Sequence, residues 1–294
     1  MKIAVIGCVQ FSQAMTEALA STPGIELAGI VTRRASTVNA DFQSLEPIGT
    51  RLGVPVLIAD GIGQDAMAAW LADRRPEVIF CVGWSSLLKP PVLKVAARGV
   101  VGYHPALLPA NRGRHPIVWA LALGLPETGS TFFVMDEGAD SGDILSQERI
   151  AIGSDDDAAS LYRRLTETAR SQIVRLAADL AAGRAEHRPQ DPARANAWRK
   201  RGPLDGRIDW RMSAGAVHNL VRALTRPYVG AHCDWQGRER KVWRTEPAGA
   251  AAPNLEPGKV LARDGRVIVV KCGDAALRLV EHEIDPLPQP GGYL

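Results

Sequence analysis

Residues 100–147 decide the fold of this chain, and they read VVGYHPALLPANRGRHPIVWALALGLPETGSTFFVMDEGADSGDILSQ. The stretch opens on a short apolar run that ends at His104, where a buried strand should end. A loop broken by proline and glycine follows, then a helix-like segment at 116–123 and an apolar strand at 130–135. That strand runs into an acidic, glycine-rich loop that contains Asp140. A histidine and a carboxylate that meet at strand ends form a general acid/base arrangement.

The residues before this stretch alternate between strand-like and helix-like segments. We expect strands at 2–7, 25–32, 55–58 and 77–82, with helices at 13–20, 63–72 and one ending at 50–53. Such alternation predicts an α/β fold with a doubly wound, mostly parallel, Rossmann-like sheet. In these sheets ligands bind beyond the carboxyl ends of the strands, so we expect His104 and Asp140 to meet there. The first turn has a single glycine, Gly7, where a dinucleotide fingerprint needs three, which argues against nicotinamide binding.

The rest of the chain predicts a second, smaller domain. An amphipathic helix at 158–182 is followed by a polar stretch without periodicity, then by a helix at 214–224. About five short strands follow, with turns at Gln236-Gly237 and Asp264-Gly265, a pattern typical of a small OB-like β-barrel. We therefore expect an N-terminal domain at 1–190, a linker at 191–206 and a C-terminal OB-like domain at 207–294.

Composition narrows the function classes. A chain of 294 residues that is 46% hydrophobic can bury the cores of two domains. Its net charge of +3 is too small to indicate a nucleic-acid partner. The four cysteines have no metal-binding spacing, so free thiols of a reducing compartment are expected, and no metal. No apolar run has membrane-spanning length, and the N-terminus lacks a signal-peptide core, so we expect a cytoplasmic protein without a membrane partner.

Linked motifs in the decisive stretch carry a family resemblance. They are HPALLP at 104–109, RGRHPI at 112–117, ETG at 127–129 and MDEGADSGD at 135–143. In order and spacing they resemble the formyltransferases that use 10-formyltetrahydrofolate. RGPLDGRIDW at 201–210 and LVRALTRPYVGA at 220–231 are similar to the C-terminal domain of methionyl-tRNA formyltransferase and of some sugar N-formyltransferases. Together these matches cover nearly the whole chain.

The resemblance implies transfer of a formyl group from 10-formyltetrahydrofolate, a co-substrate, to a primary amine. His104 would hydrogen-bond the tetrahedral oxyanion or shuttle the proton, and Asp140 would orient the imidazole or accept the amine proton. The sequence departs from the family at Gly102, where the family has an asparagine two residues before the histidine. Three explanations stay open: replacement by Asn111 or His115, occupation of the space by substrate or water, or loss of the chemistry. We favour Asn111 as the replacement.

The resemblance also assigns binding residues. The folate pocket of the family corresponds to the strand end and loop at 82–88 and to the acidic loop. The residues expected to contact the folate are Trp84, Ser85, Leu87, Leu88, Asp136, Glu137 and Gly138. Those expected to contact the amine substrate are Phe11, Arg112, Arg114 and His115. Arginine forks suit phosphate or carboxylate, but Arg112 and Arg114 could equally anchor the loop by ion pairs.

The identity of the amine is open between classes. Methionyl-tRNA formyltransferases carry a basic loop after the second strand, whereas this chain has only Arg33 and Arg34 there. A small-molecule amine, that of a nucleotide-linked amino sugar, is therefore the leading substrate, and methionyl-tRNA is the alternative. A second alternative is a non-catalytic folate or nucleotide-sugar binding protein, because Gly102 replaces the family asparagine. The sequence leaves open whether the chain forms a homodimer.

Overall fold

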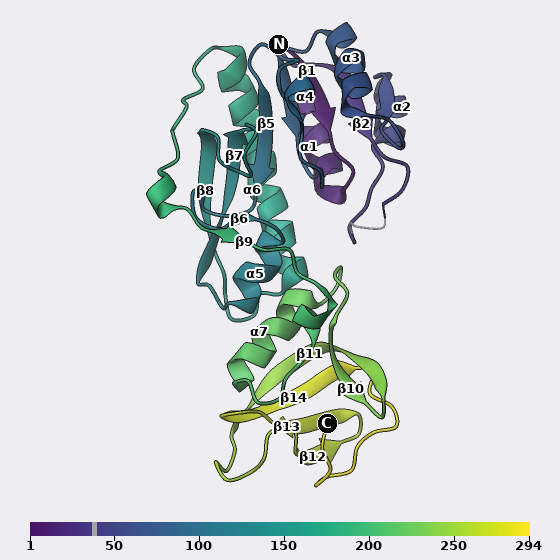
Figure 1. The fold of residues 1–294 in the computed structure, drawn as a ribbon, viewed down its shortest axis with the longest axis vertical. Coiled ribbons are helices and arrows are strands. Elements are labelled where there is room, and N and C mark those ends of the chain that lie inside the picture. The colour runs from purple at the N-terminus through teal and green to yellow at the C-terminus, as the bar shows by residue number, and fades with distance from the viewer. Residues whose placement is uncertain (37–39) are drawn as a thin grey trace. The chain divides into compact units, whose positions relative to one another are not determined.

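The computed structural model describes residues 1–36 and 40–294 and divides them into two compact units, drawn as a ribbon in Figure 1. The first unit comprises Met1–Pro116, Thr128–Ile150 and Arg163–Trp198. The second comprises Ile117–Glu127, Ala151–Tyr162 and Arg199–Leu294. Each unit is described by itself.

A seven-stranded sheet in the order β3-β2-β1-β4-β5-β7-β8 forms the centre of the first unit. Its strands are β1 (Lys2–Ile6), β2 (Glu26–Thr32), β3 (Val56–Ile58), β4 (Val78–Cys81), β5 (Val100–His104), β7 (Glu127–Val134) and β8 (Ile144–Ala151). β1 to β5 pair in parallel, and β7 runs antiparallel to β5. The predicted mostly parallel, doubly wound α/β sheet is confirmed.

Helices connect these strands along the chain. Those of the first unit are α1 (Gln10–Ala20), α2 (Glu46–Leu52), α3 (Gln64–Arg74), α4 (Pro90–Leu93) and most of α6 (Ala158–Ala181), whereas α5 (Pro116–Ala122) belongs almost wholly to the second unit. Ala4 and Ile6 of β1 join a buried apolar cluster with Met67 and Leu71 of α3, so α3 packs on this side of the sheet. On α6, Gln172 is buried and donates from Nε2 to the Ser130 carbonyl oxygen (3.2 Å) and to Ser146 Oγ (3.0 Å), which anchors that helix over β7 and β8.

The direction of β7 corrects one step of the sequence argument. Val101 lies opposite Val134 and His104 lies opposite Thr131, so β7 ends beside the beginning of β5. The strands that precede His104 and Asp140 thus end at opposite edges of the sheet. Strand topology is therefore not what brings these two residues together. Instead, the loop between β7 and β8 returns toward His104 and brings Asp140 with it. The acidic loop, rather than sheet topology, positions the carboxylate.

Two elements of the first unit have no clear pattern in the sequence. β8 is an edge strand whose residues are mostly half-exposed, so the apolar alternation that signals a strand is absent. A small parallel sheet pairs β6 (Arg112–Gly113) with β9 (Ala197–Trp198), after the short 3₁₀ helix η1 (Pro192–Arg194). These pairings attach part of the predicted linker, 191–206, to the loop that follows His104.

The second unit is built on a five-stranded antiparallel sheet in the order β10-β11-β14-β13-β12. Its strands are β10 (Ala231–Trp235), β11 (Arg238–Ala250), β12 (Val260–Asp264), β13 (Val267–Lys271) and β14 (Ala275–His282). The 3₁₀ helix η2 (Pro203–Gly206) and helix α7 (Ala214–Leu224) precede them, and α7 packs on β11 and β14. Ser213 caps α7 by accepting from the Ala216 amide at 3.1 Å. The predicted small C-terminal β domain is confirmed, and its strands are antiparallel.

The cysteines are buried free thiols in both units. Burial raises the pKa of Cys233 and of Cys272 to about 11, and it also raises the pKa of Cys81. These thiols therefore stay protonated and behave as small apolar residues. Among residues 1–36 and 40–294, none of the helices combines the length and the apolar character that a bilayer crossing requires.

Candidate active site

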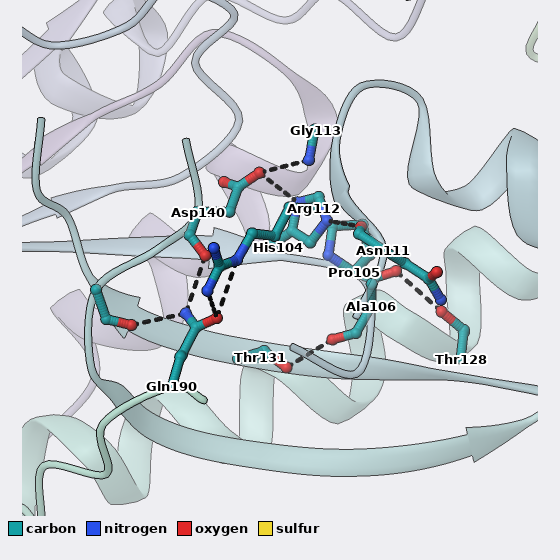
Figure 2. A network of polar contacts seen from close by, with 11 residues as sticks. His104, Pro105, Ala106, Asn111, Arg112, Gly113, Thr128, Thr131, Asp140 and Gln190 are labelled. Carbon is teal, nitrogen blue, oxygen red and sulfur yellow. Dashed lines mark hydrogen bonds and ion pairs between the residues drawn. The ribbon is translucent and has the colours of Figure 1, made fainter. Parts of the chain in front are cut away.

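His104 is the central side chain of the candidate site (Figure 2). It lies at the end of β5 and is only 4% exposed. Its Nε2 is 2.7 Å from the backbone carbonyl oxygen of Asn111, and its Nδ1 is 3.5 Å from Oδ2 of Asp140. Each ring nitrogen thus faces an oxygen. The structure brings together the three residues predicted to be catalytic.

Asp140 lies in the acidic loop and is held by the loop that follows His104. Its backbone is left-handed, with φ at 55°, which aspartate tolerates better than most residues. Its Oδ2 accepts a hydrogen bond from the Gly113 amide at 2.9 Å. Within the acidic loop, Asp136 Oδ1 accepts from the Gly138 amide (2.9 Å) and from Ser141 Oγ (2.7 Å). The carboxylate therefore keeps a fixed position beside the imidazole.

This geometry defines what the imidazole can do. The Asn111 carbonyl oxygen is only an acceptor, so Nε2 carries the proton and donates to it. In the neutral ring Nδ1 then holds the lone pair, and it faces Oδ2 of Asp140 at 3.5 Å. His104 can thus accept a proton at one nitrogen while it donates from the other.

Chain atoms fill the space beside His104 where the family carries an asparagine. Gly102 is paired with Cys81 on one side and Phe133 on the other. A Cβ at Gly102 would lie 2.9 Å from Cζ of Phe133 and 2.8 Å from Cγ of Met135. Phe133 is 3% exposed and belongs to a buried cluster with Leu108 and Ile144, so its ring cannot turn into solvent. An asparagine at this position requires the cluster to shift.

The predicted amine-site residues have different surroundings. Arg112 is half-buried, and its Nη2 and Nε donate to Oε1 of Gln190 at 2.7 and 3.2 Å. Arg114 is exposed and donates to the Ser85 carbonyl oxygen at 3.2 Å. His115 is exposed and left-handed, with φ at 56°. The two arginines thus contact other loops through hydrogen bonds to an amide oxygen and a carbonyl oxygen, whereas the role left open by the sequence was anchoring by ion pairs.

Phe11 lies at the start of α1, under the strand that carries His104. It is 6% exposed, and its ring is stacked on Tyr103 with centroids 4.3 Å apart. Tyr103 points to the face of β5 opposite His104 and accepts at its hydroxyl from Ser130 Oγ at 3.1 Å. Burial raises the pKa of Tyr103, and the hydrogen bond with Ser130 opposes this rise. The phenol stays neutral and packs as part of the core.

The predicted folate loop combines buried and exposed residues. Leu88 is 5% exposed and packs in the cluster beneath the sheet, whereas Leu87 is 66% exposed. Trp84 packs partly on the same cluster, with the Arg33 guanidinium 4.7 Å above its ring. Its indole Nε1 is buried and finds no hydrogen-bond acceptor within the described part of the chain. Ser85 and the acidic-loop residues Glu137 and Gly138 are exposed and accessible to a ligand.

Sequence reasoning missed Gln190 and Asn196. Gln190 donates from Nε2 to the carbonyl oxygens of Asp140 (2.9 Å) and Gly142 (2.7 Å). Asn196 Oδ1 accepts from the Asn111 amide at 2.7 Å. Both residues lie in a polar, aperiodic stretch, and no sequence pattern distinguishes them from a linker. Within the two ranges that the structure describes, no group of three or more His, Cys, Asp or Glu side chains is arranged to hold a metal ion.

Solved structures with the same fold provide a comparison. The sugar 3N-formyltransferase WlaRD, in the presence of dTDP and 5-N-formyl-THF, is 15% identical with a TM-score of 0.72, over 98% of this chain and 99% of its own. An N-formyltransferase from Helicobacter canadensis, in complex with folinic acid and dTDP-3-aminofucose, is 14% identical with a TM-score of 0.73, over 95% and 98%. HypX from Aquifex aeolicus in complex with tetrahydrofolic acid is 19% identical with a TM-score of 0.66. The match covers 96% of this chain but only 44% of HypX.

Family models match both parts of the sequence. The model described as "Formyl transferase" matches residues 1–177, and "Formyl transferase, C-terminal domain" matches residues 202–286. The first match contains the strand of His104, the loop of Asp140 and the predicted folate loop. The chain therefore belongs to the formyl transferase family.

Proposed function

We propose that the chain transfers the formyl group of 10-formyltetrahydrofolate to the primary amine of a nucleotide-linked amino sugar. The observation that carries the proposal is the pairing of His104 with Asp140, 3.5 Å apart, in a chain of the formyl transferase family. Formyl transfer to an amine needs a proton acceptor for the attacking nitrogen and a donor for the oxyanion. This pair supplies both functions from one imidazole.

The chemistry follows from the two ring nitrogens. The neutral amine attacks the formyl carbon, so a new C–N bond forms and the carbonyl oxygen becomes an oxyanion. The amine proton passes to Nδ1, where the Asp140 carboxylate stabilises the imidazolium. The Nε2–H now held by the Asn111 carbonyl is the donor available to the oxyanion when a ligand takes the place of that carbonyl. Collapse then breaks the bond to the folate nitrogen, which receives the proton.

The folate is expected between the loop at 82–88 and the acidic loop. The buried, unpaired Nε1 of Trp84 is a donor suited to a polar ring edge, and the exposed Leu87 offers an apolar contact. Ser85, Asp136, Glu137 and Gly138 would contribute backbone or side-chain hydrogen bonds, and Leu88 would support the loop from below.

The proposed amine is that of a nucleotide-linked sugar rather than methionyl-tRNA. Arg112 and Arg114 lie in the loop directly after His104, and guanidinium groups suit the phosphates of a nucleoside diphosphate. Arg114 is exposed, whereas Nε and Nη2 of Arg112 already donate to Gln190. The family members crystallised with dTDP or dTDP-3-aminofucose align with this chain over at least 95% of both sequences. A weakly basic chain offers few of the phosphate contacts that tRNA binding requires.

One observation favours a different function, binding of folate or of a nucleotide sugar without catalysis. The position of the family asparagine is a glycine whose Cβ space is filled by Phe133 and Met135. Loss of one oxyanion donor reduces the rate of comparable enzymes by roughly 10²–10³. A binding protein has no need of that donor.

Mass spectrometry distinguishes these functions. The purified protein is incubated with 10-formyltetrahydrofolate and a panel of nucleotide-linked amino sugars, with methionyl-tRNA as a parallel acceptor. Addition of one formyl group to a sugar nucleotide supports the proposal. Addition to methionyl-tRNA would show that methionyl-tRNA, and not a sugar nucleotide, is the substrate. Binding of the folate without a formylated product from any acceptor would favour the binding protein.

A further inference from the structure

The two loops around His104 contain three non-glycine residues with left-handed backbone. Asn111, His115 and Asp140 have φ of 66°, 56° and 55°. They are three of the five non-glycine residues with positive φ in the part of the chain that the structure describes. Asparagine, histidine and aspartate adopt this conformation more readily than most residues, but it still has a cost that surrounding contacts offset. The contacts that hold these two loops therefore bear on the geometry of the site.

Residues 188–198, here called the strap, make those contacts. At one end, the Ile144 amide donates to the Arg188 carbonyl oxygen (2.8 Å), and the Arg188 amide donates to that of Ile144 (3.0 Å). At the other end, the Arg112 amide donates to Asn196 and the Arg114 amide to Trp198, both at 3.0 Å. The strap thus spans from the start of β8 to the loop after His104.

Gln190 joins the two loops at the centre of the strap. Its Nε2 donates to the carbonyl oxygens of Asp140 (2.9 Å) and Gly142 (2.7 Å), and its Oε1 accepts two hydrogen bonds from Arg112. Figure 2 shows this amide between the acidic loop and the arginine. Both donors and the acceptor of the side chain are used, and a flipped amide would place its donors against the guanidinium.

We propose that Gln190 is a positioning residue that fixes Asp140 against His104. It does not touch the imidazole; it holds the backbone of Asp140 and, through Arg112, the loop whose Gly113 amide donates to the Asp140 carboxylate. Gln190 therefore links the backbone of the Asp140 loop to the side chain of Arg112, while Asn196 holds the Asn111 amide. The catalytic meaning of this assignment rests on the proposed function, but the positioning itself does not.

Two variants and one control test the assignment in the full-length protein. Gln190→Ala removes all four hydrogen bonds. Gln190→Glu keeps the side-chain volume and the Arg112 contact, but it replaces the amide donor to the two carbonyl oxygens by a carboxylate oxygen. Asp191→Ala is the control, because Asp191 is exposed and its side chain accepts from the Ala193 amide at 2.9 Å, within the strap.

The first readout is amide hydrogen exchange of Gly113, whose amide reports directly on the Asp140 carboxylate. We expect exchange about tenfold faster in both Gln190 variants, with β1 amides unchanged and the Asp191 variant like wild type. Unchanged exchange at Gly113 in both variants would overturn the assignment. If Gln190→Ala also speeds the exchange of β1 amides, which would indicate wider unfolding, the isosteric Gln190→Glu decides the outcome alone.

The second readout is formyl transfer. We expect the turnover number of both Gln190 variants to fall by roughly tenfold or more, while the KM for the folate stays within about twofold. A rise in KM at constant turnover number would contradict positioning of the Asp140–His104 pair. If wild type transfers no formyl group but Gly113 exchange responds as expected, the proposed function fails and the positioning role stands.

Discussion

Replacing Gly102 by asparagine tests whether the chain itself fills the space beside His104. Gly102 is a central residue of β5, with strands on both sides. Its added Cβ would meet Cζ of Phe133 at 2.9 Å and Cγ of Met135 at 2.8 Å, distances that require a shift of these side chains. Because Phe133 is 3% exposed, the shift must be made within the packed cluster.

Extra atoms in a packed core destabilise a protein by about 1–3 kcal/mol. We therefore expect Gly102→Asn to lower the free energy of unfolding by about 2 kcal/mol and the midpoint of thermal unfolding by about 4–8 °C. Gly102→Ala, which adds only the Cβ, should give a smaller loss. Gly63→Asn is the matched control: no heavy atom lies within 4 Å of its Cβ position, and asparagine and glycine both suit the N-cap of α3.

A double variant identifies the residue that fills the space. Phe133→Ala alone should destabilise by about 3–5 kcal/mol, because it leaves a cavity. Adding Gly102→Asn should then restore packing. The loss of unfolding free energy in the double variant should be smaller than the sum of the two single losses by about 1–2 kcal/mol. Denaturant unfolding measures each variant. A Gly102→Asn protein within about 0.5 kcal/mol of wild type, or an additive double variant, would refute the reasoning.

Three further variants test other parts of the account. His104→Ala should reduce formyl transfer by roughly 10²–10⁴ with folate binding retained, and near-normal turnover would exclude His104 from the chemistry. Asn111→Ala should slow turnover if the side-chain amide replaces the family asparagine, and an unchanged rate would leave only the backbone carbonyl as its contribution. Burial lowers the pKa of His282, and its Nδ1 accepts from the Ile284 amide at 3.1 Å, so the unfolded state binds a proton more readily. The second unit should therefore keep its full stability above pH 6.5 and lose stability as the pH falls below it. His282→Gln should weaken this pH dependence, as measured by denaturant unfolding. An unchanged pH profile would show that His282 is not its source.

The sheet could be predicted because its buried strands have a strong sequence signal. The apolar run that ends at His104 needs no partner to be recognised as a strand, and its parallel neighbours repeat the pattern. The direction of β7 could not be predicted, since apolar residues at 130–135 fit a parallel or an antiparallel strand equally well. The structure brings His104, Asn111 and Asp140 together, but Asp140 approaches through its loop and not through a shared strand edge.

Contacts made by the backbone and by single side-chain amides could not be predicted from the sequence. Gln190 is one polar residue in a polar stretch, and its role depends on the path of the strap, which periodicity does not encode. The motif around Gly102 shows that an asparagine is missing, but only packing shows that Phe133 occupies its space. Asn111 was expected to act through its side chain, whereas the contact with His104 is made by its carbonyl oxygen.

The most direct test of the central claim is a single-turnover measurement at saturating 10-formyltetrahydrofolate with the acceptor identified by mass spectrometry. Asp140→Asn is the variant, because asparagine tolerates the left-handed backbone and can still accept from the Gly113 amide while it removes the charge. We expect wild type to transfer the formyl group and Asp140→Asn to do so at a single-turnover rate lower by a factor of about 10²–10⁴, with equal affinity for the folate. A wild-type protein that binds folate but formylates no acceptor, or an Asp140→Asn protein with the wild-type rate, would contradict this expectation.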